Sequence, residues 1–225
     1  MNKRRVIILF LLAILIAGIS TGIFRSIFNN YLKEIHLFTS ADRGFIEFPR
    51  ELFGFLIVFV IGGLYFFTEQ GLISLGLFAA GLSYIGFAYF SPTYSLLIVW
   101  MLLWSFGSHL FVNLRSVLGL SIADENHKGH FLGKMAAMNS VGFIFGTLII
   151  WLFVSHLDFS LSYLIAFIAA SLSALIFLLL PVKKHYNLEK RNKFIFKKKY
   201  KHYYMLASLF GLRKQLFLVF AMVYY

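Results

Sequence analysis

The sequence lacks cysteine altogether and is poor in proline and acidic residues, with 3 Pro and 9 Asp plus Glu in 225 residues. The absence of cysteine excludes disulfides and thiolate-ligated metals. Charged residues make up only 13% of the chain, whereas hydrophobic residues make up 60% and aromatic residues 19%. A soluble domain rarely exceeds about half apolar residues. Because the excess is arranged in long runs, the sequence predicts an all-α integral membrane protein with several membrane spans, with the lipid bilayer as its first partner.

The apolar runs predict six complete membrane spans and part of a seventh, because a membrane helix needs about 20 mostly apolar residues. The expected spans are Val6–Phe24, Phe48–Phe67, Gly71–Phe90, Thr93–Leu114, Phe131–Ser155, Ser160–Pro181 and Lys201–Tyr225. Pro49 is tolerated in a first helical turn, so the second span could also begin near Phe45. The first run resembles a signal peptide, but it is too long and no convincing cleavage site follows. We therefore expect an uncleaved first span.

The basic residues predict that the N-terminus is cytoplasmic. The segments that would then lie inside hold 15 of them: Lys3, Arg4, Arg5, Arg115, Lys128, Lys134, Lys183, Lys184, Lys190, Arg191, Lys193, Lys197, Lys198, Lys199 and Lys201. The outside segments hold four, namely Arg25, Lys33, Arg43 and Arg50. Cytoplasmic loops of membrane proteins carry such an excess. The net charge of +12 is thus explained by membrane topology rather than by nucleic-acid binding.

The clearest break in the chain is the polar, basic segment that follows Pro181. We expect residues 1–181 to form a six-helix transmembrane bundle, 182–200 a cytoplasmic linker, and 201–225 the start of a second bundle. The basic stretch 182–201 would lie against the inner leaflet, either simply solvated or as a specific site for anionic lipid headgroups.

A weak internal repeat connects the end of the chain with its first span. Aligning "AGISTGIFRSIFNNYL" with "FGLRKQLFLVFAMVYY" places Gly211 on Gly18, Phe217 on Phe24 and Tyr224 on Tyr31. Both segments follow a basic stretch, so the last one is predicted to restart the bundle as a truncated seventh helix.

In that alignment Arg213 and Lys214 occupy the positions of Ser20 and Thr21. Charges inside a membrane helix usually face the bundle interior or a water-filled path. The two cations would then line a cavity and favour an anionic solute. Alternatively, the seventh helix begins after Lys214 and both charges stay at the cytoplasmic surface.

This layout of six spans, a basic linker and a restart resembles the first half of a major facilitator superfamily transporter. "RGFIEFPRELFGFLIVF" is similar to the entry of helix 2 in one bacterial branch of that family, and "FGLRKQLFLVF" is similar to its helix 7. "GSHLFVNLRSVLGLSIADENHKGHFLGKMAAMNSVGFIFGTLI" resembles the region of helices 4 and 5. The loop "GGLYFFTEQGLIS" departs from the family because it lacks the usual aspartate and arginines. The resemblance implies a six-helix bundle of major facilitator type.

Polar side chains inside the expected spans are the candidates for a solute site. Ser105, His109 and Asn113 share one face of the fourth span at i, i+4 and i+8, and they either line a cavity or hydrogen-bond between helices. Together with Ser20, Thr21, Arg213 and Lys214, His109 and Asn113 form the predicted substrate-binding set. Glu47 and Glu51, at the outer end of the second span, and His109 are the candidate protonatable groups for a proton-coupled carrier. The spacing favours the alternative, in which Arg43 pairs with Glu47 at the surface.

No pattern in the chain indicates an enzyme, a cofactor or a metal site. Gly142 and Gly146, like Gly18 and Gly22, predict close packing between helices. Two functions follow. The first is alternating-access transport of a small solute by the N-terminal half, or a truncated form, of a major facilitator carrier. The second is a non-transporting remnant, scaffold or assembly protein that keeps one half of the fold.

Overall fold

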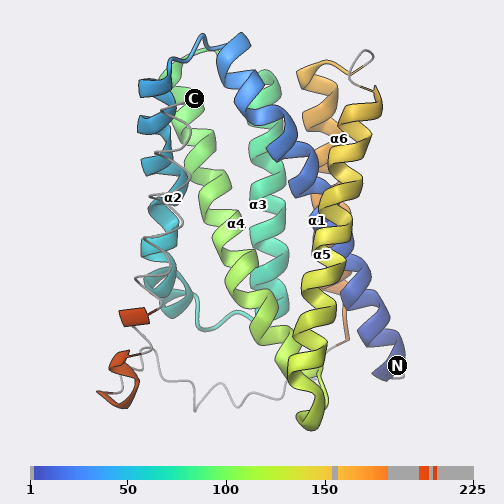
Figure 1. Ribbon diagram of the computed structural model, residues 1–225. Coiled ribbons are helices and arrows are strands. Elements are labelled where there is room, and N and C mark those ends of the chain that lie inside the picture. Colours follow the sequence, from blue (N-terminus) through green and yellow to red (C-terminus); the bar gives the residue numbers. More distant parts are fainter. Residues whose placement is uncertain (1–2, 154–156, 182–197, 203–204, 207–225) are drawn as a thin grey trace.

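The computed structural model is a bundle of long helices (Figure 1). It describes residues 3–153, 157–181, 198–202 and 205–206, in which no strand occurs. The long helices are α1 (Lys3–Glu34), α2 (Ser40–Gly63), α3 (Glu69–Tyr89), α4 (Tyr94–Ile122), α5 (Lys128–Phe153) and α6 (Phe159–Leu179). Two short 3-10 turns, η1 (Glu125–His127) and η3 (Lys198–Tyr200), complete the described part. Most of the expected seventh span and most of the linker lie outside the described residues.

Five of these helices, all except α2, are long and apolar enough to cross a membrane. This agrees with a multi-pass membrane protein. Helix α2 differs because its first half carries five charged residues, namely Asp42, Arg43, Glu47, Arg50 and Glu51. A sixth span therefore remains a prediction that rests on the helix itself and on its apolar second half.

Helix α2 begins at Ser40, eight residues before the predicted Phe48. Thr39 starts it with a capping box: its hydroxyl oxygen accepts from the Asp42 backbone N–H at 3.3 Å, and its own N–H donates to the Asp42 carboxylate at 2.9 Å. Such reciprocal bonds satisfy donors that a helix start leaves free. The prediction that Pro49 lies in the first turn was therefore wrong, because Pro49 lies in the helix interior.

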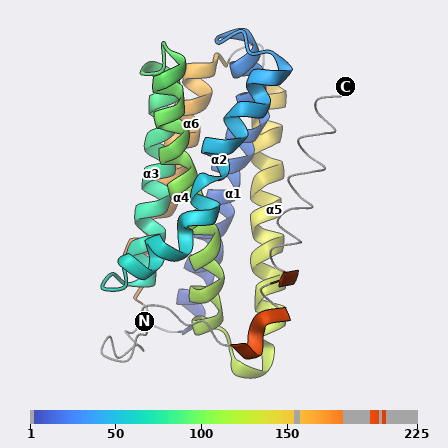
Figure 2. The ribbon, with the colours of Figure 1, turned by 90° about the vertical axis from the view of Figure 1, so that its left-hand side faces the viewer.

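The helix contacts follow a repeat in which α1–α3 correspond to α4–α6. Helix α1 packs against α5 and α6, and α4 packs in the same way against α2 and α3, while α3 and α6 pack against each other. Figures 1 and 2 show that successive helices alternate in direction, so that α1 and α4 are antiparallel. The two units of three helices are thus related as an inverted repeat.

Glycines bring the paired helices into backbone contact. A Cβ at Gly18 or Gly22 of α1 would collide with the Asn139 or Phe143 carbonyl oxygen of α5. Conversely, one at Gly142 or Gly146 would collide with a carbonyl oxygen of α1. Close approach of this kind is the main use of small residues between membrane helices. The predicted packing role of these four glycines is confirmed.

Buried serines add hydrogen bonds across the same contacts. Ser20 of α1 donates to the carbonyl oxygen of Ala166 in α6 at 2.8 Å, and Ser173 of α6 donates back to that of Ala13 at 2.8 Å. Ser74 of α3 donates to Ala174 of α6 at the same distance. Phe24, Tyr84, Phe87, Trp104 and Tyr163 form an aromatic cluster in the same part of the core as Ala166.

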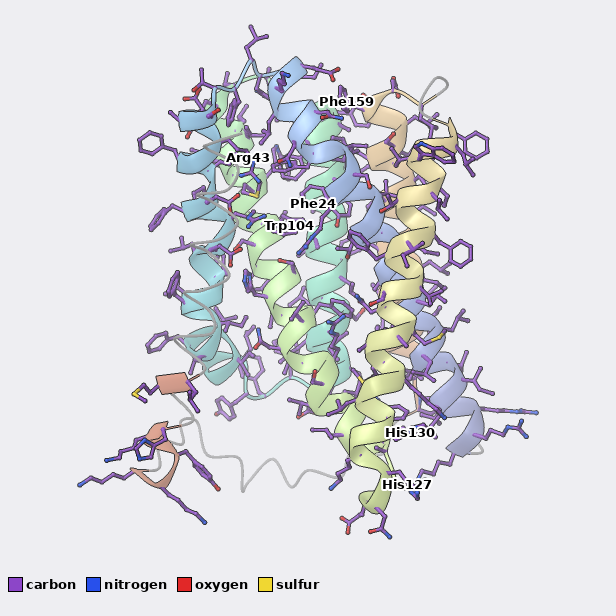
Figure 3. All side chains as sticks on the ribbon, in the orientation of Figure 1. Phe24, Arg43, Trp104, His127, His130 and Phe159 are labelled. Atoms are coloured by element: carbon purple, nitrogen blue, oxygen red, sulfur yellow. The ribbon has the colours of Figure 1, made fainter. Side chains whose placement is uncertain are left out.

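The start of α1 lies beside the link between α4 and α5. Lys3 forms an ion pair with Asp124, and its hydrogen bond and charge hold the pKa of that carboxyl below its usual range. His127 and His130 lie at the same end of the bundle (Figure 3). The link between α1 and α2, with the exposed Leu37, lies at the opposite end.

This arrangement gives a direct test of orientation. Because the chain has no native cysteine, Leu37→Cys and His127→Cys each create a single labelling site. With the N-terminus inside, a membrane-impermeant maleimide is expected to label Leu37→Cys on intact cells, and His127→Cys only after the membrane is opened. The reverse pattern would overturn the orientation.

Candidate functional site

The candidate site is a cluster of charged side chains on one face of α2. Arg43, Glu47, Arg50 and Glu51 stand at i, i+4, i+7 and i+8, which places them on the same side of a helix. Glu51 is the twelfth of the 24 residues of α2 and therefore lies midway along it. In a helix that spans a membrane, charges at that position are costly unless they are paired or hydrated. Glu47 and Glu51 were expected at the outer end of the second span, but α2 begins earlier than predicted, so Glu47 is its eighth residue and Glu51 its twelfth.

Glu47 connects the two arginines of this face. Its carboxylate contacts the Arg43 guanidinium through one oxygen and the Arg50 guanidinium through the other, the latter at 2.5 Å. The predicted pair of Arg43 with Glu47 is present. Both arginine side chains and Glu47 are less than one-fifth exposed, so these are pairs in a largely desolvated environment.

Arg43 also connects α2 to α1. Its Nε donates to the Asn29 side-chain oxygen at 2.9 Å, and its guanidinium lies 5.9 Å from the centre of the Phe28 ring. Figure 3 shows Arg43 between α2 and α1, with Phe24 and Trp104 deeper in the bundle. The two rings pack with their centres 4.9 Å apart. An aromatic layer thus lies on the α1–α4 side of the charge cluster.

Glu51 lies between Arg50 and His109 of α4. One carboxylate oxygen is 3.2 Å from the Arg50 guanidinium, and the other is 3.5 Å from Nε2 of His109. His109 is the sixteenth of the 29 residues of α4, so the pair is close to the middle of both helices. The opposite ring nitrogen, Nδ1, is 2.8 Å from the Ser105 carbonyl oxygen.

The His109 ring fits between α2 and α4 because residue 54 is glycine. A Cβ at Gly54 would lie 2.9 Å from Nε2 of His109 and 3.6 Å from the Glu51 carboxylate. The Ser105 hydroxyl accepts a hydrogen bond from the Phe53 backbone N–H at 3.3 Å. This turn of α2 is therefore held against the same segment of α4 that orients the imidazole.

Arg25 of α1 completes the cluster. It lies nine residues before the end of α1 at Glu34, or about 14 Å along the axis, and its side chain is exposed. It interacts electrostatically with Arg50, Glu51 and Glu47. Among the described residues, no carboxylate lies within 4.0 Å of Arg25. It was expected in the segment after the first span, but α1 continues ten residues past Phe24, so Arg25 lies within the helix.

The predicted substrate-binding residues separate into three groups. His109 belongs to the charge cluster, and Asn113, one turn further along α4, is exposed and donates to the His109 carbonyl oxygen at 2.7 Å. Ser20 is buried in the α1–α6 contact, which does not fit a place on a cavity wall, and Thr21 donates to the Ala17 carbonyl oxygen of its own helix. Arg213 and Lys214 lie outside the described residues, so their predicted role is untested.

Sequence reasoning named Glu47, Glu51 and His109 as candidate protonatable groups, but it missed Arg25 and Arg50 and did not bring these residues into one site. For Arg50 the signal was available in the spacing of charges along residues 43–51, which follows one helical face. A search for apolar runs does not detect this spacing, because it places the start of the helix after the charged residues. Within the described ranges, no three of His, Asp and Glu gather closely enough to hold a metal ion.

Comparison with known proteins assigns no family to the chain. No protein-family model matches the chain, and no curated protein matches it either.

Proposed function

We propose that the chain forms the first half of a solute carrier of the major facilitator type, which moves a small solute by alternating access. The inverted repeat of α1–α3 and α4–α6 supports this, because each six-helix half of such carriers contains two units of three helices in opposite orientation. The expected basic linker and restart of the bundle agree with the same plan.

The observation that carries the proposal is the charged cluster between α1, α2 and α4, in which Glu51 and His109 lie near the middle of their helices. Arg25, Glu47, Arg50, Glu51 and His109 come from α1, α2 and α4 and interact with one another. Ionisable groups at that depth mark solute or ion pathways in membrane proteins. A membrane protein that serves only as a scaffold has no need to place ionisable side chains inside its helices, where they lower its stability.

The charge of the cluster favours an anionic solute. Three arginines face two glutamates, and the surplus positive charge belongs to Arg25, which has no carboxylate within 4.0 Å among the described residues. Arginine binds carboxylate and phosphate oxygens through parallel hydrogen bonds. A small carboxylate- or phosphate-bearing solute would balance this charge as it binds.

The natural gene product that carries this chain would be purified, reconstituted into liposomes and assayed for counterflow with radiolabelled anionic, neutral and cationic solutes. We expect saturable flux of an anion, and we expect Arg25→Gln to raise its half-saturation concentration about 10- to 100-fold. Loss of one charge-assisted bond of about 1.5–3 kcal/mol accounts for this factor. Lys33→Gln removes an equal charge from the exposed end of the same helix and should leave flux unchanged.

The possible outcomes separate the parts of this proposal. Saturable flux of a neutral or cationic solute that does not respond to Arg25→Gln would retain the carrier and remove the anion class. Absence of saturable flux for every solute class would remove the carrier and favour a non-transporting protein.

A further inference from the structure

The hydrogen bonds of His109 determine which of its ring nitrogens carries a proton. Nδ1 lies 2.8 Å from the Ser105 carbonyl oxygen, which can only accept, so Nδ1 is the protonated nitrogen. The Ser105 hydroxyl is further from Nδ1, at 3.5 Å, and already accepts from the Phe53 N–H. In neutral imidazole the other nitrogen, Nε2, then presents a lone pair.

That lone pair faces the Glu51 carboxylate at 3.5 Å. Two acceptors that face each other repel unless a proton lies between them. From this juxtaposition we propose that Glu51 and His109 form a proton-binding site midway across the membrane, in which one proton is shared between the Glu51 carboxylate and Nε2 of His109.

Proton binding at this pair is balanced without any other reactant. A proton that arrives through water adds to Nε2 and gives an imidazolium beside the carboxylate, or it adds to Glu51 and gives a carboxylic acid that donates to Nε2. In both forms Nδ1 keeps its bond to the Ser105 carbonyl, and the charge of the cluster rises by one. Release reverses the step.

The neighbours determine how strongly the proton is held. Arg50 contacts the Glu51 carboxylate at 3.2 Å, and Glu47 lies on the far side of Arg50. From α1, Arg25 acts on both glutamates and on Arg50 through space. Each arginine opposes the added charge and each glutamate favours it. A solute anion that reaches Arg25 would therefore strengthen proton binding, and the proton would strengthen anion binding by the same factor, because coupling between two sites is reciprocal.

If proton and anion binding strengthen each other in this way, the carrier is an anion symporter and the proton is its coupling ion. Only this extension rests on the proposed function. The proton site itself can be tested on the chain without any solute. The chain would be labelled with ¹⁵N-histidine, placed in lipid nanodiscs and studied by NMR between about pH 8 and pH 5, where histidines change charge. The His109 signals are those that disappear in His109→Gln.

In the wild-type chain we expect Nε2 of His109 to gain a proton across this range while Nδ1 stays protonated. In Glu51→Gln the amide donates to the Nε2 lone pair, so Nε2 should remain hydrogen-bonded but unprotonated. Glu34→Gln, at the exposed outer end of α1, should behave as wild type. The proposal would be overturned if Nε2 took up a proton in Glu51→Gln as it does in wild type. It would also be overturned if, as the pH rises, the ring lost its proton from Nδ1 before it lost the one from Nε2.

A second variant tests the geometry while both groups are retained. Gly54→Ala places a methyl group 2.9 Å from Nε2 and should push the ring away from Glu51, so that a further Glu51→Gln change affects the His109 signals less. Gly44→Ala, a site in the same helix with nothing within 4 Å of the added carbon, is the matched control. A full effect of Glu51→Gln on the Gly54→Ala background would contradict the direct contact.

The transport experiment separates the two proposals. If a pH gradient accelerates solute uptake in wild type, and Glu51→Gln abolishes that acceleration but leaves solute exchange intact, the proton is the coupling ion. Solute flux that is independent of pH, together with an Nε2 that does not respond to Glu51, would remove the proton site and leave the carrier. A proton shared as expected, without solute flux, would remove the carrier and leave the site.

Discussion

Replacing Glu47 by glutamine is expected to lower the free energy of unfolding by about 3–5 kcal/mol, the range found when one partner of a buried ion pair is removed. The Glu47 side chain is only 15% exposed, and its two oxygens serve Arg43 and Arg50. A neutral amide cannot balance the charge of either guanidinium, so both charges would remain in the bundle. Arg43 would keep only its hydrogen bond to Asn29, and Arg50 only its longer contact with Glu51.

The measurement is equilibrium unfolding of the purified chain in mixed micelles of mild detergent and dodecyl sulfate. Glu34→Gln, which removes the same charge from an exposed position, should change stability by less than about 0.5 kcal/mol. The double change Arg43→Gln with Glu47→Gln should recover part of the loss, because it removes one of the unbalanced cations together with the carboxylate. A Glu47→Gln protein as stable as wild type would show that water, not Glu47, neutralises the arginines.

Replacing Gly142 by alanine should lower stability by about 1–3 kcal/mol, the usual cost of inserting a methyl group into a tightly packed contact. The added carbon would collide with the Leu15 carbonyl oxygen of α1. That oxygen belongs to the helix backbone and cannot rotate away as a side chain does, so the two helices must separate. In lipid no hydrophobic force restores their contact, because association depends on packing and hydrogen bonds.

Gly133→Ala is the matched control, because it lies in the same helix and an added carbon there meets nothing within 4 Å. It should be neutral or slightly stabilising, since alanine favours helix over glycine by about 1 kcal/mol. Equal stabilities of the two variants in the same mixed-micelle titration would mean that α1 and α5 are not held together through Gly142.

Sequence reasoning predicted the parts of the fold that depend on local pattern. Long apolar runs correctly indicated α3, α5 and α6 to within a few residues, and glycine spacing indicated that α1 and α5 each pack closely against another helix. The start of α2 was missed because the capping box at Thr39 begins a helix within a charged stretch, where hydropathy is low. Hydropathy measures the preference for lipid, whereas a helix begins wherever its first N–H groups find acceptors.

The site could be predicted only in part, because a sequence shows which residues share a helix face but not which helix that face meets. The stripe of Ser105, His109 and Asn113 was recognised, and His109 is indeed in the cluster. Ser20 looked equivalent by sequence, yet its hydroxyl lies in the α1–α6 contact. Glu51 could be assigned to His109 only once α2 was placed against α4.

The pairing of α1 with α5 also affects how the chain is made. Helix α1 leaves the ribosome before α5, the helix that covers Gly18 and Gly22, which is completed about 120 residues later. At a synthesis rate of about 5–20 residues per second, α1 waits on the order of 10 s before its permanent neighbour exists. During that interval its glycine face and Arg25 must be sheltered by lipid headgroups, by the insertion machinery or by α2. A membrane-embedded chaperone that retains early helices would therefore affect the yield of this protein through α1 more than through α6, which finds α1 and α3 already in place.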